Sequence, residues 1–146
     1  MEKLVALCYV WAFGLSDKSD YALELDRLFL KAPENDLLLE LEGLGSDRAA
    51  AWARLGRFTD RLNIDLFGKE LFAALEKVYS ENRFTLAEFG RRCYSLWNAL
   101  PYQPYQYQHI EPFCTLTYAD DPLSYGDERQ SRDLYEWAFD YYKEQK

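Results

Sequence analysis

The chain of 146 residues contains few of the residues that build catalytic, metal and disulfide sites. It has a single histidine and three cysteines, Cys8, Cys93 and Cys114, which are far apart in sequence and form no CxxC pair. Three cysteines cannot all pair within one chain, and this spacing is not that of zinc ligands. We therefore expect free, buried thiols in a reducing compartment, with no metal and no cofactor.

Long apolar runs are scarce as well. The segment from Leu4 to Phe13 is too short to span a bilayer, which needs about 20 apolar residues. It contains the bulky Tyr9 and Trp11, and no small-x-small cleavage site follows, so a signal peptide is not indicated. We expect a buried first helix in a cytoplasmic protein that makes no membrane contact.

The familiar catalytic motifs are also missing. No serine lies in a GxSxG elbow, and Gly43-Leu44-Gly45 lacks the preceding strand and the lysine of a phosphate loop. A serine or cysteine nucleophile would depend entirely on His109. Acid pairs occur at Asp36 and Glu40 and at Asp120-Asp121, but no DxD or ExxH arrangement accompanies them. These features favour a protein without catalytic activity.

Acidic residues are abundant: the net charge is −8. From Asp20 to Asp47, eight acids face two bases, a balance of −6, and from Glu111 to Lys146, nine acids face four bases, a balance of −5. The middle, from Arg48 to Asn98, has nine bases and six acids, a balance of +3. Such acidity disfavours binding to nucleic acid or to anionic membranes, and it favours binding to a basic protein partner. Many acidic proteins have no such partner, so this alternative stays open.

The pattern of apolar residues predicts an all-α fold. Apolar side chains recur at three- and four-residue steps in most of the chain, as in Leu25, Leu28 and Phe29. Thr85 and Asp127 are typical helix caps. The length suits one domain, residues 1–146, and we expect a compact bundle of six or seven helices. In the last helix, the residues expected to face the core are Leu134, Trp137, Ala138 and Tyr141.

One short segment is ambiguous. In residues 36–42 the leucines alternate with other residues in part, as in a half-buried strand. Leucine and glutamate are nevertheless good helix formers, and no β-branched residue is present. We expect a helix here, ending at Gly43 or Gly45.

A long loop rich in proline and tyrosine is expected at residues 101–126, before the last helix. Cys114 to Tyr118 could form one short strand within it. Tyrosine gives a large contact area at low entropic cost, so Tyr102, Tyr105 and Tyr107 are candidate anchors for a partner. Alternatively, the loop covers the core with its aromatic rings.

The segment Tyr21 to Leu44, and within it Leu28-Phe29-Leu30 followed by Pro33-Glu34-Asn35-Asp36-Leu37-Leu38-Leu39-Glu40-Leu41-Glu42, resembles small acidic bacterial proteins that neutralise toxins. These are the immunity proteins of contact-dependent and polymorphic toxin systems. The resemblance covers about a sixth of the chain. It implies a catalysis-free helical protein that presents carboxylates to a basic toxin domain.

The hypothesis from the sequence is thus an immunity-type protein that binds a cationic toxin domain, for example a nuclease. Its acids would steer the encounter and its tyrosines would anchor the contact. The alternatives are a small enzyme with a carboxylate or His109 site, and a structural subunit of a bacterial or phage assembly. The oligomeric state is left open. The candidate partner-binding residues are Asp36, Glu40, Glu42, Tyr102, Tyr105, Tyr107, His109, Asp120 and Asp121.

Overall fold

The computed structural model describes residues 1–56, 61–100 and 109–144, and within these the protein is helical, with no strand. The prediction of an all-α fold is confirmed. The α-helices are α1 (Glu2–Ala12), α2 (Ser19–Lys31), α3 (Asp36–Leu44), α4 (Arg48–Leu55), α5 (Ile64–Glu81), α6 (Leu86–Asn98) and α7 (Glu128–Tyr141), and the 3₁₀ helices η3 (Phe113–Thr117) and η4 (Asp121–Tyr125) precede α7.

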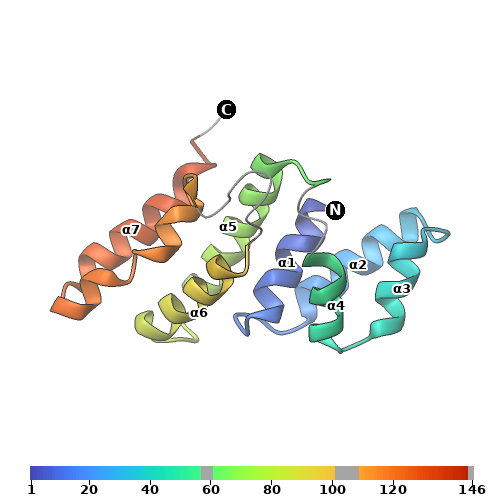
Figure 1. Ribbon diagram of the computed structural model, residues 1–146, viewed down its shortest axis with the longest axis horizontal. Helices are drawn as coiled ribbons and strands as arrows, with labels where there is room; N and C mark the ends of the chain where they lie inside the picture. The colour runs from blue at the N-terminus through green and yellow to red at the C-terminus, as the bar shows by residue number, and fades with distance from the viewer. Residues whose placement is uncertain (57–60, 101–108, 145–146) are drawn as a thin grey trace.

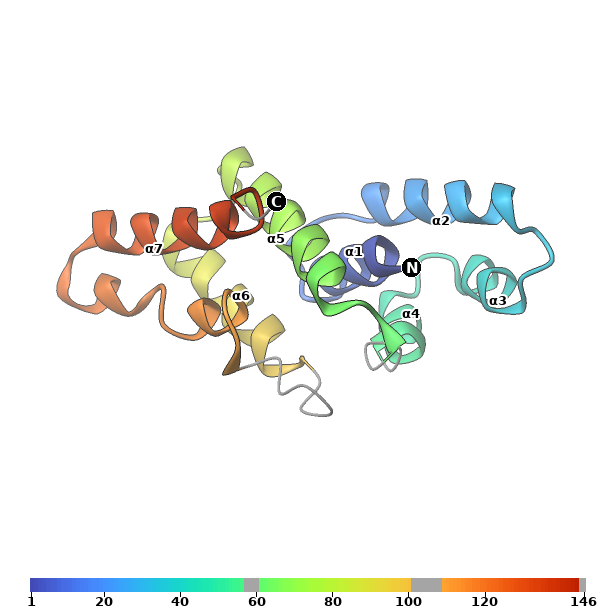
Figure 2. The same cartoon turned by 90° about the horizontal axis from the view of Figure 1, so that it is seen from above.

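The helices are arranged along one long axis. In Figure 1, α7 lies at one end, α5, α6 and α1 lie in the middle, and α2 and α3 lie at the other end. The view from above agrees: α2 and α3 lie far from α7, and α1 lies between α2 and α4 (Figure 2). Helices α2 and α3 therefore form one end of the bundle, and α7 forms the opposite end.

Helix α1 is the centre of the core. All eight residues from Leu4 to Trp11 are buried, because α1 packs against α2, α4 and α5. Tyr9 illustrates this packing: its ring lies 6.3 Å from that of Trp52 on α4 and 5.9 Å from that of Phe67 on α5. A helix that is apolar on every side must be buried on every side. The prediction of a buried first helix is confirmed.

The predicted helix starts are explained by side-chain caps. The Thr85 hydroxyl accepts a hydrogen bond from the Glu88 amide at 3.1 Å, and Asp127 accepts one from the Gln130 amide at 3.0 Å. Asn35 caps α3 in the same way, and α3 ends before Gly45, whose φ of +58° suits glycine. The ambiguous segment 36–42 is thus a helix, as we expected.

The expected core face of α7 is partly wrong. Trp137 is 45% exposed, whereas the buried residues of α7 are Ser131, Tyr135, Ala138 and Phe139. Leu134 and Trp137 are apolar and three residues apart, as on one face of a helix. The residues of α7 that contact α5 and η3 belong to a neighbouring stripe. The shapes of α5 and η3 decide which side of α7 can pack closely against them.

The described part of the predicted loop, residues 109–126, is also more ordered than expected. Cys114 to Tyr118 is not a strand, since η3 covers most of it, and η4 follows. Phe113 and Leu116 are fully buried where η3 packs on α6 and α7. This part of the segment therefore completes the core. Among the described helices, none combines the length and apolar character needed to cross a bilayer.

Candidate partner-binding surface

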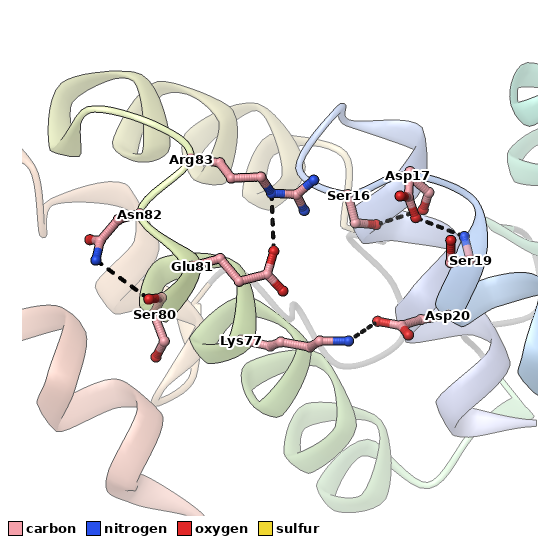
Figure 3. Close-up of polar contacts among 9 residues, drawn as sticks. All are labelled: Ser16, Asp17, Ser19, Asp20, Lys77, Ser80, Glu81, Asn82 and Arg83. Atoms are coloured by element: carbon pink, nitrogen blue, oxygen red, sulfur yellow. Dashed lines mark hydrogen bonds and ion pairs between the residues drawn. The ribbon is translucent and has the colours of Figure 1, made fainter.

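The most acidic stretch of the sequence forms one end of the molecule, which we call the α2–α3 end (residues 19–44). Three of its acids are neutralised by ion pairs. Lys77 of α5 reaches across to Asp20 at 2.7 Å, as Figure 3 shows. Arg54 of α4 binds Glu40 at 2.8 Å. The third pair joins Glu24 to Arg27 within α2 at 2.6 Å.

Four other acids of the α2–α3 end form no ion pair with the described residues. Asp26, Glu34, Asp36 and Glu42 are exposed, and no cation of the described residues lies within ion-pair distance of them. Two of the three acids predicted on this segment, Asp36 and Glu42, belong to this set. Because these charges face water, their field extends outward to a distance of about one Debye length, roughly 8–10 Å.

Asp26 and Glu42 bring two carboxyl groups together where α2 meets α3. Partial desolvation raises the pKa of Glu42 above its usual value, and the hydrogen bond and negative charge of Asp26 raise it further, while Lys18 opposes the change. Two neighbouring carboxylates repel each other when both are ionised. A cation placed beside them would relieve this repulsion, so the pair favours a positively charged partner.

Exposed leucines lie among these acids. Leu30 is 81% exposed, Leu23 is 69% exposed and Leu39 is 48% exposed. Leu23 and Leu30 are seven residues apart on α2, about two turns, so they point in nearly the same direction. That direction is opposite to the buried Tyr21 and Leu25. The outer face of α2 therefore offers apolar contact area that the fold itself does not use.

A groove of about 420 Å³ runs beside this face between α1, α2 and α5. Leu23 and Ala74 contribute apolar walls, and Glu24, only 4% exposed, contributes a buried carboxylate. Arg27 holds that carboxylate with two hydrogen bonds of 2.7 and 2.6 Å, and this bonding lowers the pKa of Glu24. The Glu24–Arg27 ion pair thus lies at one side of the groove, and Leu23 contributes an apolar wall.

The other predicted residues lie elsewhere. Asp120 and Asp121 belong to the start of η4, which packs on α7 at the opposite end of the bundle. Burial raises the pKa of Asp120, whose Cβ lies where a side chain at Gly90 would stand. His109 is exposed and precedes η3. The structure therefore does not bring the acids of α3 and those of η4 together.

The predicted tyrosine anchors Tyr102, Tyr105 and Tyr107 lie outside the described residues. Their role stays a prediction.

The three thiols are unsuited to nucleophilic chemistry. Cys8 and Cys93 are buried, Cys114 is half-buried, and all three are free, as expected. Burial raises the pKa of Cys8 to about 12 and also raises the pKa values of Cys93 and Cys114. A thiol reacts as its thiolate, so a raised pKa disfavours attack at neutral pH. The described residues contain no group of three or more His, Cys, Asp or Glu side chains placed to hold a metal ion.

Comparison with known proteins found no match to this chain among family models, curated proteins or solved structures.

The exposed leucines were not predicted from the sequence, although a signal was present. Leu23 and Leu30 fall on the side of α2 opposite to Leu25, which the helical spacing had already assigned to the core. An apolar pair seven residues apart lies on one side of a helix, and on the solvent side it adds exposed apolar area. The groove has no comparable signal, because its walls come from three separate helices.

Proposed function

We propose that this protein is a non-catalytic protein-binding module that binds a basic protein partner through the α2–α3 end. The observation that carries the proposal is the outer face of this end, where exposed leucines lie among acids without cationic partners. In its specific form, the proposal is an immunity-type protein that acts in the bacterial cytoplasm and neutralises a cationic toxin domain such as a nuclease.

The physical roles of the two residue types differ. Exposed acids such as Glu34 and Asp36 attract a basic protein at long range and raise the association rate. The leucines contribute after contact, because apolar area removed from water stabilises the complex by about 25 cal/mol per Å². Binding of this kind weakens as ionic strength rises, mainly through the association rate.

A pull-down with the tagged protein, from the native host at low salt, tests the proposal. We expect mass spectrometry to identify a basic protein in stoichiometric amount. With that partner purified, the double variant Glu34→Gln/Asp36→Asn should slow association about fivefold at low salt, since it removes two surface charges. Inhibition of the partner's activity by the wild-type protein would then support the immunity-type form.

The matched control is Asp133→Asn/Glu136→Gln on α7. It changes the net charge by the same amount, but at the opposite end of the bundle, on exposed residues. We expect its effect to be much smaller. Recovery of the protein alone, or equal slowing by both double variants, would contradict a contact at the α2–α3 end.

A further inference from the structure

A second concave surface, with a different chemistry, lies between the end of α1, α4 and α6. This cleft has a volume of about 640 Å³. Clefts that hold small molecules typically measure about 300–1,000 Å³. Its described lining comes from the end of α1 with Phe13, from α4 and from the second half of α6 with Ala99. The size therefore suits a small organic molecule.

Aromatic side chains form much of the wall. The Phe13 and Trp52 rings lie 5.8 Å apart at an interplanar angle of 89°, so they pack edge to face against each other and form one continuous wall. Trp52 is further held by the ring of Tyr9 in the core. Tyr94, on α6, is 46% exposed at the cleft. Rigid aromatic walls of this kind favour a flat apolar ligand.

The charge of the cleft is opposite to that of the whole protein. Among the described residues that line it, Arg48 is the one charged side chain, whereas the chain as a whole carries −8. No carboxylate of the described residues lies within ion-pair distance of Arg48, and its Nη1 donates one hydrogen bond, of 3.5 Å, to the Trp11 carbonyl. A guanidinium has five N–H donors in a fork that matches a carboxylate. Most of these donors remain available to a ligand.

Asn98 adds a second polar group. It lines the cleft from α6, its side chain is exposed, and an amide can both donate and accept hydrogen bonds. Arg48 is the first residue of α4, whose N-terminus is already capped by the Asp47 carboxylate, so the guanidinium itself is the group that attracts an anion. The polar groups of the cleft thus favour a negatively charged ligand group.

We propose that this cleft binds a small aromatic carboxylate, with the ligand ring against the wall formed by Phe13, Trp52 and Tyr94 and the carboxylate on Arg48. This site is independent of the α2–α3 end. The cleft carries a cation and would bind an anionic ligand, whereas the α2–α3 end is proposed to bind a basic protein.

Titration of the ¹⁵N-labelled protein with cinnamate, followed by NMR, tests the proposal. Cinnamyl alcohol, which has the same ring and chain without the charge, is the comparison ligand. We expect cinnamate to shift the indole N–H signal of Trp52 and the amide signals of Ala49 and Asn98 in a saturable way. Its affinity should exceed that of cinnamyl alcohol roughly fivefold, because a guanidinium–carboxylate bond is charge-assisted.

Three variants make the test specific. Arg48→Gln should lower cinnamate affinity roughly fivefold and leave cinnamyl alcohol unchanged. Ala49→Phe, at an exposed position, should fill the cleft and weaken both ligands. Arg54→Gln removes a cation from the same helix outside the cleft and should change neither affinity. Absence of saturable shifts with cinnamate, or equal cinnamate affinities of wild type and Arg48→Gln, would overturn the proposal.

Discussion

Helices α1 and α2 pack side by side, yet their burial is opposite. In α1, eight consecutive residues are buried. In α2, only Tyr21, Glu24 and Leu25 are buried, while Leu23 and Leu30 are mostly exposed. Both helices contain leucine, so the difference is not one of composition alone. It shows that apolar residues in this protein serve two purposes: some hold the core together, and others remain available on the surface.

The buried charge of α2 sharpens the comparison. Glu24 is 4% exposed, and its partner Arg27 is 50% exposed. A buried carboxylate is costly unless it is bonded, and Arg27 supplies two hydrogen bonds. Helix α1 contains no charged side chain in its buried run, whose polar side-chain groups are the Cys8 thiol, the Tyr9 hydroxyl and the indole N–H of Trp11. Helix α2 therefore combines a core face, a charged groove wall and an apolar outer face.

The largest expected effect is in α1. Leu4→Ala should lower the free energy of unfolding by about 2–5 kcal/mol, because Leu4 is fully buried and the change leaves a cavity. Urea unfolding followed by circular dichroism measures this loss. The control is Leu30→Ala, the same substitution at an exposed position of α2, which should change stability by less than about 0.5 kcal/mol. Similar losses for the two variants would contradict the distinction between the helices.

An intermediate effect is expected at Glu24. Glu24→Gln should lower the free energy of unfolding at neutral pH by about 1 kcal/mol, because a neutral amide replaces a charge-assisted acceptor. Arg27 lowers the pKa of Glu24 below its usual 4.5, so the folded state favours the ionised form. The stability from this charge is therefore present above about pH 4.5 and is lost as the pH falls through the lowered pKa.

Denaturant unfolding of both proteins across this pH range measures the difference. The control is Glu128→Gln on α7, whose ion pair with Arg132 has both side chains largely exposed. It should cost less than about 0.5 kcal/mol. A stability difference at Glu24 that stays constant from neutral pH down to full protonation would show that charge is not its cause.

The smallest effect on stability, and the clearest effect on binding, is expected at Leu30. Leu30→Ser should change the free energy of unfolding by less than about 0.5 kcal/mol, because the side chain is 81% exposed. It should weaken binding of the basic partner about tenfold, since burying a leucine contributes about 1.5–3 kcal/mol. Calorimetry with the purified partner measures this. Unchanged affinity would exclude the outer face of α2 from the contact.

Much of the fold could be predicted from local patterns. The caps at Thr85 and Asp127 are present because a side-chain oxygen and an amide three residues later belong to the same turn. The core position of Leu25 also follows from helical spacing. The prediction for Trp137 was wrong because it used hydrophobicity alone. The shapes of α5 and η3 decide which side of α7 is buried.

The candidate surfaces were predictable only in part. The acidic character of the α2–α3 end follows from charge counting, since its residues are contiguous in the chain. The neutralisation of Glu40 does not, because its partner Arg54 is 14 residues away on another helix. The cleft at Arg48 could not be predicted from the sequence, because its walls come from three separate helices, α1, α4 and α6.

The sequence by itself therefore determined the helical class, the main helices with their caps and the central position of α1, because each depends on residues within a few turns of one another. Only the tertiary structure decided which acids keep their charge, which leucines face water and where Arg48 meets Phe13 and Trp52. Those outcomes depend on how separate helices pack, and close packing is selected by the shapes of all the neighbours together.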